Sequence, residues 1–307
     1  MAVSDNALCP TGRLPAGILN INKPAGLTSH DVVARVRRWT GQRKVGHAGT
    51  LDPLATGVLL VCLGPATRLA EYLMAGRKVY RAVVYLGVET DTYDADGVVL
   101  RSGPLPDLTL DQIGRALAGF QGAVEQVPPP YSAVRHKGVR LYRLARQGTL
   151  LHAAARPVEI EAIQLLAWET PHLTLEVTCS PGTYIRSLAH DLGGALGTGG
   201  HVSELTRLAS GRWRIDQAIT LEQLEAGVQA GDWMRWVQPM HTAVDNLERI
   251  DLSEELAGRV VLGQAVRLDL ASQPNLVRAH APGGYLLALL EPADQPGWWH
   301  PAKVLGC

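Results

Sequence analysis

The chain has 307 residues, 46% of them hydrophobic, and its 29 Lys and Arg residues balance 29 Asp and Glu residues. This length and composition allow one large domain and a small one, and they exclude a minimal scaffold that depends on disulfide bonds. Apolar runs fall well below the ~18 residues that cross a bilayer, and the scattered cysteines form no C-x-x-C pair, so we expect neither a membrane span nor structural zinc.

The first predicted elements run from residue 17 to residue 86. Residues 17–22 are predicted as a short strand, and Ser29 as the N-cap of a helix that ends near Gly41. The apolar face of that helix carries Val32, Val33, Val36 and Trp39. A loop over 42–56 leads to a buried strand over 57–63, followed by a helix over 66–74 and a strand over 78–86.

The middle of the chain alternates helices and strands irregularly. Thr109 with Gln112, and Thr220 with Gln223, have the T-x-x-Q spacing of a capping box, which marks two helix starts. The prolines of VPPPY at 127–131 predict a non-helical link because they remove backbone donors. Alternation over 173–177 predicts a strand, and a helical pattern follows over 185–196. This order indicates an α/β or α+β domain with a mixed sheet, and we predict α+β.

The character of the chain changes beyond Asp245. Short Val- and Leu-rich segments at 266–270, 276–280 and 285–290 are separated by Gly, Pro and Asp turns. We therefore predict two domains, residues 1–248 and a small β-rich unit of residues 249–307 with the strand pattern of a small barrel.

Positive charge is concentrated in the first half of the chain. Residues 1–150 hold 18 Lys and Arg against 11 Asp and Glu, a net charge of +7, and the remainder has a net charge of −7. One basic cluster comprises Arg35, Arg37, Arg38, Arg43 and Lys44, and a second comprises Arg135, Lys137, Arg140, Arg143 and Arg146, with Tyr131 and Tyr142 interleaved. Such clusters suit a phosphate backbone, and two solvated helix faces would explain them equally well.

The segment GHAGTLDPLATGVLL, residues 46–60, combines several local signals. Gly46, Gly49 and Gly57 allow tight turns or the close approach of a ligand. Pro53 disfavours a helical conformation at Asp52, so this carboxylate is expected in an extended or turn segment before a buried strand. Such a position suits a catalytic carboxylate, although Asp-Pro is also a common turn dipeptide.

The same segment resembles the catalytic signature of the TruB-type pseudouridine synthases, which isomerise uridine 55 in the T loop of tRNA. Other blocks resemble that family in the same order along residues 14–215: NINKPAGLTSHDVV, KVYRAVVYLGVETDTYDADG, PPPYSAVRHKGVRLYRLARQG, CSPGTYIRSLAHDLG and HVSELTRLASG. The resemblance implies a mixed-sheet synthase domain and a tRNA isomerase that needs no cofactor.

The resemblance implies catalytic roles for three residues. Asp52 would attack C6 of the base, attack C1′ of the ribose, or remove the 2′ proton. Arg186 would keep Asp52 ionised, since a cation within about 4–6 Å opposes the effect of desolvation; a surface ion pair is the alternative. Tyr80 would lie against the base and help to remove the C5 proton, which requires activation of a group with a pKa of about 10; a core tyrosine is the alternative.

Five further residues are implied to bind the substrate. Tyr184 would line the pocket on the other side of the base, and Leu205 matches a pocket-lining position that a core leucine explains equally well. His47 would fill the space left by the extruded base, unless this lone histidine is structural. Lys23 lies in the matching N-terminal block, and Lys78 shares a strand face with the active-site tyrosine and would reach a phosphate.

The match has a departure and a weaker C-terminal part. Pro181 occupies a position that we expect to be variable and often basic, so a phosphate contact is lost there. Residues 249–307 resemble the PUA domain of these synthases in composition and position only, and such a domain would contact the acceptor end of tRNA. Its acidic residues do not favour a strong grip on phosphates: Asp251, Glu254, Glu255, Asp269, Glu291 and Asp294.

Two other functions remain open. An RNA-guided synthase of the archaeal and eukaryotic type shares the Asp motif but relies on protein and guide-RNA partners; the long block at about 98–155 instead favours a stand-alone enzyme with a tRNA-binding insertion. An RNA-binding or RNA-folding protein without chemistry is the other possibility, and an intact Asp52, Tyr80 and Arg186 set disfavours it. The N-terminal segment shows no export signal, so we expect a cytoplasmic protein. The resemblance to a stand-alone synthase implies a monomer with no obligate protein partner.

Overall fold

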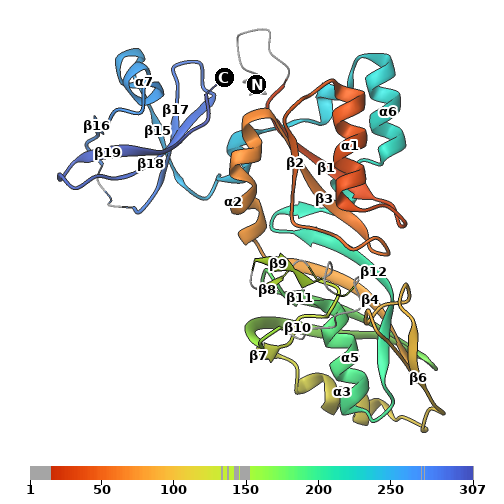
Figure 1. Cartoon of the computed structure of the whole chain (residues 1–307). Helices are drawn as coiled ribbons and strands as arrows, with labels where there is room; N and C mark the ends of the chain where they lie inside the picture. Colours follow the sequence, from red (N-terminus) through yellow and green to blue (C-terminus); the bar gives the residue numbers. More distant parts are fainter. Residues whose placement is uncertain are drawn as a thin grey trace.

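The computed structural model describes residues 15–132, 134–136, 138–141, 145, 153–270, 272 and 274–306. Part of the second basic cluster lies outside the described residues and side chains, namely Lys137, Arg143, Arg146 and Tyr142 and the side chains of Arg135 and Arg140. Figure 1 shows two units, a larger one built on a ten-stranded sheet and a smaller one built on a five-stranded sheet. Within the described ranges, no helix is long and apolar enough to span a membrane.

The large sheet is mixed. Its order is β14-β1-β3-β12-β4-β11-β10-β7, with β13 paired to β12 and β2 paired to β3. These strands are β1 (Gly17–Lys23), β2 (Val45–Ala48), β3 (Thr56–Leu63), β4 (Lys78–Leu86), β7 (Gly122–Gln126), β10 (Arg156–Glu169), β11 (His172–Cys179), β12 (Gly200–Ser210), β13 (Trp213–Arg214) and β14 (Gln238–Pro239). β3 and β12 run parallel, whereas the other adjacent pairs are antiparallel.

Helices cover one face of this sheet. They are α1 (Ser29–Thr40), α3 (Leu110–Ala118), α5 (Ile185–Ala195) and α6 (Leu221–Ala230). A fifth helix, α2 (Ala70–Ala75), follows the 3-10 helix η1 (Gly64–Leu69) and lies apart from them at the junction with the small unit (Figure 1). Apolar residues of these four helices pack with the strands into one core, which includes Val36, Leu59, Ile113, Leu188 and Leu224. Burial of this face fixes the positions of the loops at the strand ends.

The start of α1 corrects one expectation. Thr28, and not Ser29, is the N-cap: its hydroxyl accepts from the Asp31 amide at 3.1 Å, and the Asp31 carboxylate accepts from the Thr28 amide at 2.9 Å. A T-x-x-D capping box therefore begins one residue earlier than predicted. Because Thr28 caps the helix, the buried Ser29 hydroxyl has a different role: it bonds to the backbone of Leu51.

Most of the other expected elements are present. The strands at 17–23, 56–63 and 78–86, the helix at 185–195 and the capping boxes at Thr109 and Thr220 are confirmed. The expected loop at 42–56 contains the short strand β2. The expected helix at 66–74 is shorter, since η1 occupies its first turn.

The small unit is β-rich, as predicted. Its sheet order is β15-β17-β18-β19-β16, from β15 (Glu248–Asp251), β16 (Val266–Arg267), β17 (Val277–His280), β18 (Leu286–Pro292) and β19 (Trp298–Val304). The helix α7 (Glu254–Val261), which the sequence did not suggest, packs on this sheet through Ala257 and Val260. The α+β class with a mixed sheet and a β-rich C-terminal part is therefore confirmed.

Candidate active site

Asp52 lies in the loop between β2 and β3, and neighbouring elements hold that loop from several sides. The Ser29 hydroxyl, on α1, accepts from the Leu51 amide at 2.9 Å and lies 3.1 Å from the Leu51 carbonyl. The carbonyl of Pro53 accepts from the Gly26 amide at 2.9 Å and from the Lys23 Nζ at 3.2 Å. The residues on both sides of Asp52 are thus fixed by partners far away in the sequence.

Arg207 supports the same loop from β12. Its side chain is buried, and its guanidinium donates to three backbone carbonyls: Nε to Val58 at 2.7 Å, Nη1 to Thr50 at 3.3 Å and Nη2 to Gly49 at 3.1 Å. The close approach of β3 to β12 requires Gly57, since a Cβ there would lie 2.3 Å from the Arg207 carbonyl oxygen. No role was expected for Arg207, although it lies in the quoted block HVSELTRLASG.

Arg186 and Asp52 form the central ion pair. Nη2 of Arg186 donates to Oδ1 of Asp52 at 3.0 Å, and Nε lies 3.0 Å from Oδ2. The Arg186 side chain is 6% exposed, whereas the Asp52 side chain is 31% exposed. The Asp52 carboxylate is therefore partly open to solvent, whereas the Arg186 guanidinium is enclosed. A ligand can reach Asp52 without displacing the arginine.

A second carboxylate, Asp94, shares the same arginine. Nη1 of Arg186 donates to Oδ2 of Asp94 and to the carbonyl of Thr92, each at 3.1 Å. Nη2 also donates to the carbonyl of Tyr131 at 3.0 Å. Sequence reasoning missed Asp94, although it belongs to the quoted segment DTYDADG.

These charges determine the ionisation of Asp52. Burial raises the pKa of Asp52, Arg186 lowers it, and the nearby Asp94 charge raises it. The arginine therefore opposes the effect of burial, as expected, without cancelling it.

Tyr80 lies on β4 with its side chain buried, and its cross-strand partner on β12 is Arg207. Burial raises the pKa of the Tyr80 phenol, while the charge and a hydrogen bond of Arg207 act in the opposite direction. Asp52 is close enough to act on the same phenol. The buried arginine is thus a candidate for the group that activates Tyr80.

The amines of Lys23 and Lys78 both donate hydrogen bonds to backbone carbonyls. Nζ of Lys23 also donates to the carbonyls of Pro24 at 2.9 Å and Leu27 at 2.6 Å. Nζ of Lys78 donates to the carbonyl of Met74 at 2.9 Å and to that of Gly76. Burial lowers the pKa of each lysine to about 8. A phosphate contact by Lys78 would require its amine to leave these carbonyls.

His47 lies on β2, near the loop that carries Asp52. Its ring is 5.2 Å from that of His30 in an edge-on arrangement. Burial lowers the pKa of His47 to about 4, so its imidazole is neutral at physiological pH. A neutral ring suits contact with a base better than contact with a phosphate.

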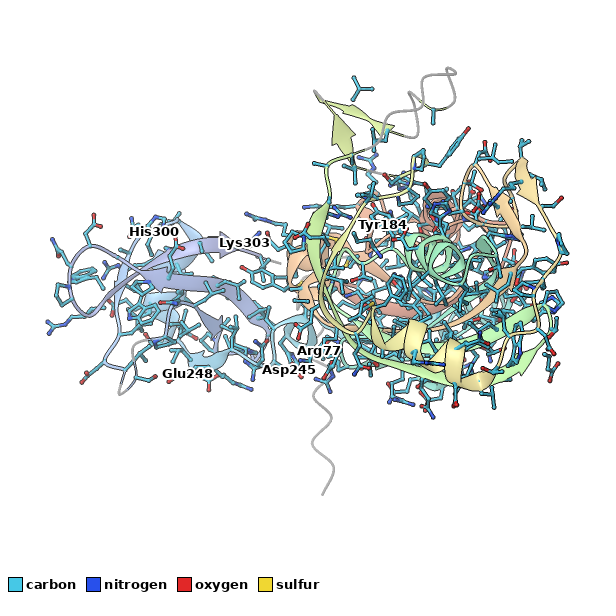
Figure 2. The ribbon with its side chains drawn as sticks, turned by 90° about the horizontal axis from the view of Figure 1, so that it is seen from below. Arg77, Tyr184, Asp245, Glu248, His300 and Lys303 are labelled. Atoms are coloured by element: carbon cyan, nitrogen blue, oxygen red, sulfur yellow. The ribbon has the colours of Figure 1, made fainter. Side chains whose placement is uncertain are left out.

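Tyr184 and Leu205 come from two different elements of the large unit, Tyr184 from the start of α5 and Leu205 from β12. Tyr184 is the N-cap residue of α5 (Figure 2), and the Gln126 side chain bonds its amide at 2.7 Å and its carbonyl at 2.9 Å. The Arg156 guanidinium lies 5.0 Å from the centre of its ring. Leu205 is buried in the same hydrophobic core as Tyr80, which agrees with its expected alternative as a core leucine.

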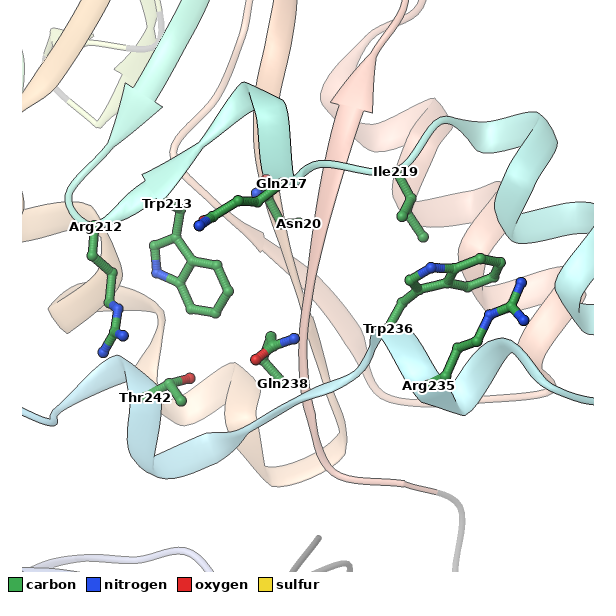
Figure 3. Close-up of a pocket in the computed structure, with 9 residues that line it drawn as sticks. All are labelled: Asn20, Arg212, Trp213, Gln217, Ile219, Arg235, Trp236, Gln238 and Thr242. Atoms are coloured by element: carbon green, nitrogen blue, oxygen red, sulfur yellow. The ribbon is translucent and has the colours of Figure 1, made fainter. Parts of the chain in front are cut away.

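A cavity of about 370 Å³ lies elsewhere on the large unit, between Trp213 and Trp236 (Figure 3). None of the predicted catalytic residues lines it. Its two arginines are paired with carboxylates, Arg212 with Asp245 and Arg235 with Asp232 at 2.5 Å. In the part of the chain that the structure describes, no group of three His, Cys, Asp or Glu side chains is arranged to hold a metal ion.

Two family models match the chain. Residues 37–185 match the model of the N-terminal domain of TruB family pseudouridylate synthases. Residues 186–245 match that of the tRNA pseudouridylate synthase B C-terminal domain. Both Asp52 and Tyr80 fall in the first match, and Arg186 opens the second.

Whole-chain comparisons agree with these models. The chain is 45% identical to a tRNA pseudouridine synthase B of Dehalococcoides mccartyi over 94% of this chain and 96% of that protein. It is 48% identical to one of Gloeobacter violaceus over 81% of this chain and 86% of the other. Among solved structures, it resembles a chain of a Cbf5-Nop10-Gar1 complex with a TM-score of 0.71 and 29% identity, covering 94% of this chain and 84% of the other.

Proposed function

The chain belongs to the TruB family of pseudouridylate synthases, and from this we propose that it converts uridine 55 in the T loop of tRNA to pseudouridine, with Asp52 as the catalytic carboxylate. The observation that carries the proposal is the Asp52–Arg186 pair, in which a buried guanidinium supports a partly open carboxylate. We further expect the protein to act in the cytoplasm as a monomer, without a cofactor.

The reaction breaks the bond between uracil N1 and ribose C1′, turns the base and joins C5 to C1′, after which the C5 proton leaves. Asp52 serves in one of three ways: by attack on C6, by attack on C1′, or by removal of the 2′ proton. Each requires an ionised carboxylate, which the Arg186 contacts at 3.0 Å favour. The surrounding carbonyl contacts keep the loop in place, so little reorganisation accompanies the reaction.

The remaining residues are proposed to hold the extruded base. Extrusion costs a few kcal/mol of lost stacking and pairing, which contacts in the pocket must offset. Tyr80 lies against the base and, as a phenolate, takes up the C5 proton; burial raises the pKa of this phenol, and the charge and hydrogen bond of Arg207 favour the ionised form that the step requires. Tyr184 and Leu205 enclose the base, and the neutral ring of His47 fills the vacated space in the loop.

The T stem-loop is proposed to lie against the basic residues of α1 and the loop that follows it. Arg37, Arg38, Arg43 and Lys44 are exposed there. The insertion at about 98–155 adds contacts to the substrate, and residues 249–307, as a PUA-like domain, reach the acceptor end. The solved relatives include a synthase bound to protein partners, but the relatives at 44–48% identity carry the name tRNA pseudouridine synthase B, which favours a stand-alone enzyme.

The direct test is tritium release from C5-labelled uridine in a T-arm hairpin, with the purified chain alone in a chelator. Release is expected, and mapping of the product is expected to find one modified uridine, at position 55. Absence of release with intact hairpin binding would favour the alternative of an RNA-binding protein without chemistry. Release only after addition of a guide RNA or a partner protein would favour the RNA-guided alternative.

Asp52→Asn is the matched variant. The amide is nearly isosteric with the carboxylate and keeps an acceptor for Arg186, so the fold and the hairpin affinity are expected to persist. It offers neither a nucleophile nor a base, and tritium release is therefore expected to fall to background. Normal turnover by Asp52→Asn would overturn the assignment of Asp52.

A further inference from the structure

Tyr93 has an unusual backbone conformation close to the candidate active site. Among the residues that the structure describes, it is the one non-glycine residue with a positive φ, 63°. A bulky residue rarely adopts this conformation, and it persists only where its surroundings enforce it. The two neighbours of Tyr93 are Thr92 and Asp94, both of which accept hydrogen bonds from Arg186.

We propose that Tyr93 and His190 form a stacked pair that positions the 92–94 turn on Arg186 and, through that arginine, orients the ion pair with Asp52. Neither ring is proposed to touch the substrate. Both residues are positioning residues for the reaction, and this inference rests on the proposed function of the same site.

The stack connects the turn to the helix that carries the arginine. The rings of Tyr93 and His190 have centroids 3.9 Å apart and are inclined by 8°. His190 lies four residues after Arg186 on α5, so both side chains leave the same helix face. Burial and the nearby carboxylates of Asp191 and Glu89 raise the pKa of Tyr93, which keeps its ring uncharged.

The backbone of the turn is attached to β12 on its other side. The Tyr93 carbonyl accepts from the Val202 amide at 3.0 Å, and the Val202 carbonyl accepts from the Ala95 amide at 2.9 Å. The Thr90 hydroxyl donates to the Asp94 carbonyl at 2.7 Å, which closes the turn. These bonds fix the turn to the sheet, whereas the stack fixes it to α5.

Arg186 depends on this placement because a guanidinium is planar. Its Nη1 donates to Asp94 and to the Thr92 carbonyl at 3.1 Å, and these two acceptors determine the plane of the group. The opposite edge, Nε and Nη2, then faces Asp52 at 3.0 Å. A shift of the turn would rotate this edge, and misplacement by about 1 Å at a reacting group can cost roughly a hundredfold in rate.

Two substitutions remove the stack. Tyr93→Gly deletes the ring while a glycine adopts the positive φ without strain, and His190→Ala deletes the other ring. For each variant, kcat for tritium release is expected to fall about 10- to 100-fold, with KM for the hairpin unchanged. His190→Phe restores a flat ring without a titratable group, and it is expected to recover most of kcat. Unchanged kcat in Tyr93→Gly would overturn the proposal.

A double-mutant cycle separates positioning from general destabilisation. Tyr93→Gly is expected to lower kcat much less in an Asp94→Ala background, since both changes act through the same contact on Arg186. If the fold-decreases in kcat of Tyr93→Gly and Asp94→Ala simply multiply in the double variant, Tyr93 does not act through the Asp94–Arg186 contact, and the proposal is overturned. The matched control is His172→Ala, which removes a ring 5.1 Å from Tyr85, a contact between two strands with no link to Arg186; its kcat is expected to be unchanged.

A measurement without catalysis distinguishes this proposal from the proposed function. NMR of the Arg186 guanidinium reports its rotation about the Nε–Cζ bond, which contacts on both edges slow down. Separate Nη signals are expected in the unaltered chain and merged signals in Tyr93→Gly, whether or not the hairpin is a substrate. Identical signals in both proteins would overturn the positioning role even if the enzyme releases tritium.

Discussion

Arg186 pairs with two carboxylates, Asp52 and Asp94, and Asp94 has two opposite effects on Asp52. Asp94 fixes Nη1 of the arginine at 3.1 Å and thereby orients the edge that serves Asp52. The same Asp94 charge raises the pKa of Asp52, because two anions near one another disfavour ionisation. Asp94 therefore holds Arg186 in place, but it also offsets part of the lowering of the Asp52 pKa that Arg186 produces.

Asp94→Asn is expected to move the acid limb of activity to lower pH. The proposed reaction requires ionised Asp52, so kcat/KM is expected to fall as the pH drops through the pKa of Asp52. Burial raises that pKa and the Asp94 charge raises it further, so removal of this charge lowers it. The ionised form then persists at lower pH, while the rate at neutral pH falls because Arg186 loses a charged anchor.

The measurement is kcat/KM for tritium release as a function of pH, with the unaltered chain as reference. Asp96→Asn is a suitable control, since this carboxylate is exposed on the same turn. An acid limb that stays in place, or moves to higher pH, would contradict the assigned effect of Asp94.

The residues of the site differ in how far sequence alone identifies them. Asp52, Tyr80 and Arg186 each lie in a motif block, but Asp94 is one of three aspartates in DTYDAD. Folding separates them: Asp91 accepts from the Val98 amide at 2.7 Å, and only Asp94 is placed on Arg186. Asp94 directly follows Tyr93, whose positive φ no sequence pattern indicates.

The loop around Asp52 is fixed by elements that are distant along the chain. β1 supplies Lys23, α1 supplies Ser29 and β12 supplies Arg207, and each bonds to loop backbone. Buried carbonyl and amide groups need such partners, because a loop lacks the regular pairing of a helix or strand. The position of the Asp52 carboxylate therefore depends on the sheet order as well as on its own motif.

Arg207→Lys is expected to loosen this loop while keeping the charge. A lysine ammonium cannot reproduce the planar fork that spans the carbonyls of Val58, Thr50 and Gly49. Loss of buried hydrogen bonds costs about 1–3 kcal/mol for each unpaired group. Both the melting temperature and kcat/KM should decrease, the latter by about a hundredfold if Asp52 shifts by roughly 1 Å.

Arg214→Lys serves as its control, because Arg214 is an exposed arginine on the adjacent β13 whose Nε lies 3.5 Å from the equally exposed carboxylate of Asp216. Thermal unfolding and kcat/KM should be nearly unchanged in this control. Equal behaviour of the two lysine variants would contradict the role of Arg207.

Two strands of the large sheet, β10 and β12, were not predicted from the sequence, and their irregular pairing explains why. β10 pairs with β11 through register shifts near Ile160 and Leu165, and β12 pairs with β4 through shifts near Val202 and Arg207. Each irregularity breaks the two-residue alternation by which a half-buried strand is identified. In contrast, β11 was found from the regular alternation of its buried residues. The helix α7 was missed because it buries only two side chains.

At the scale of the whole molecule, the two units share a hydrophobic cluster. It joins Ile18, Leu60 and Leu69 of the large unit to Leu289 and Leu305 of the small one. Polar contacts add to it: Nζ of Lys303 donates to the Arg68 carbonyl at 3.2 Å, on the side of the small unit that faces α2 (Figures 1 and 2). The C-terminal unit is thus packed against the large unit and is not simply tethered to it.

Leu305→Ala is expected to uncouple the unfolding of the two units. Leu305 is buried in the shared cluster, and its truncation should remove about 2–5 kcal/mol from that contact. The small unit keeps its own core around Val277, Leu290 and Trp299, so it can still fold. Calorimetry should show one transition for the unaltered chain and two for Leu305→Ala, since a shared core makes two units unfold together.

The control for this variant is Val261→Ala, which truncates an exposed residue of α7 and should leave a single transition at the same temperature. Two transitions in the unaltered chain would show that the shared cluster does not couple the units. Below the first transition of Leu305→Ala, tritium release should keep its kcat, because Asp52, Arg186 and the anchors of the loop all belong to the large unit. A fall in kcat there would mean that the small unit contributes to the geometry of the site itself.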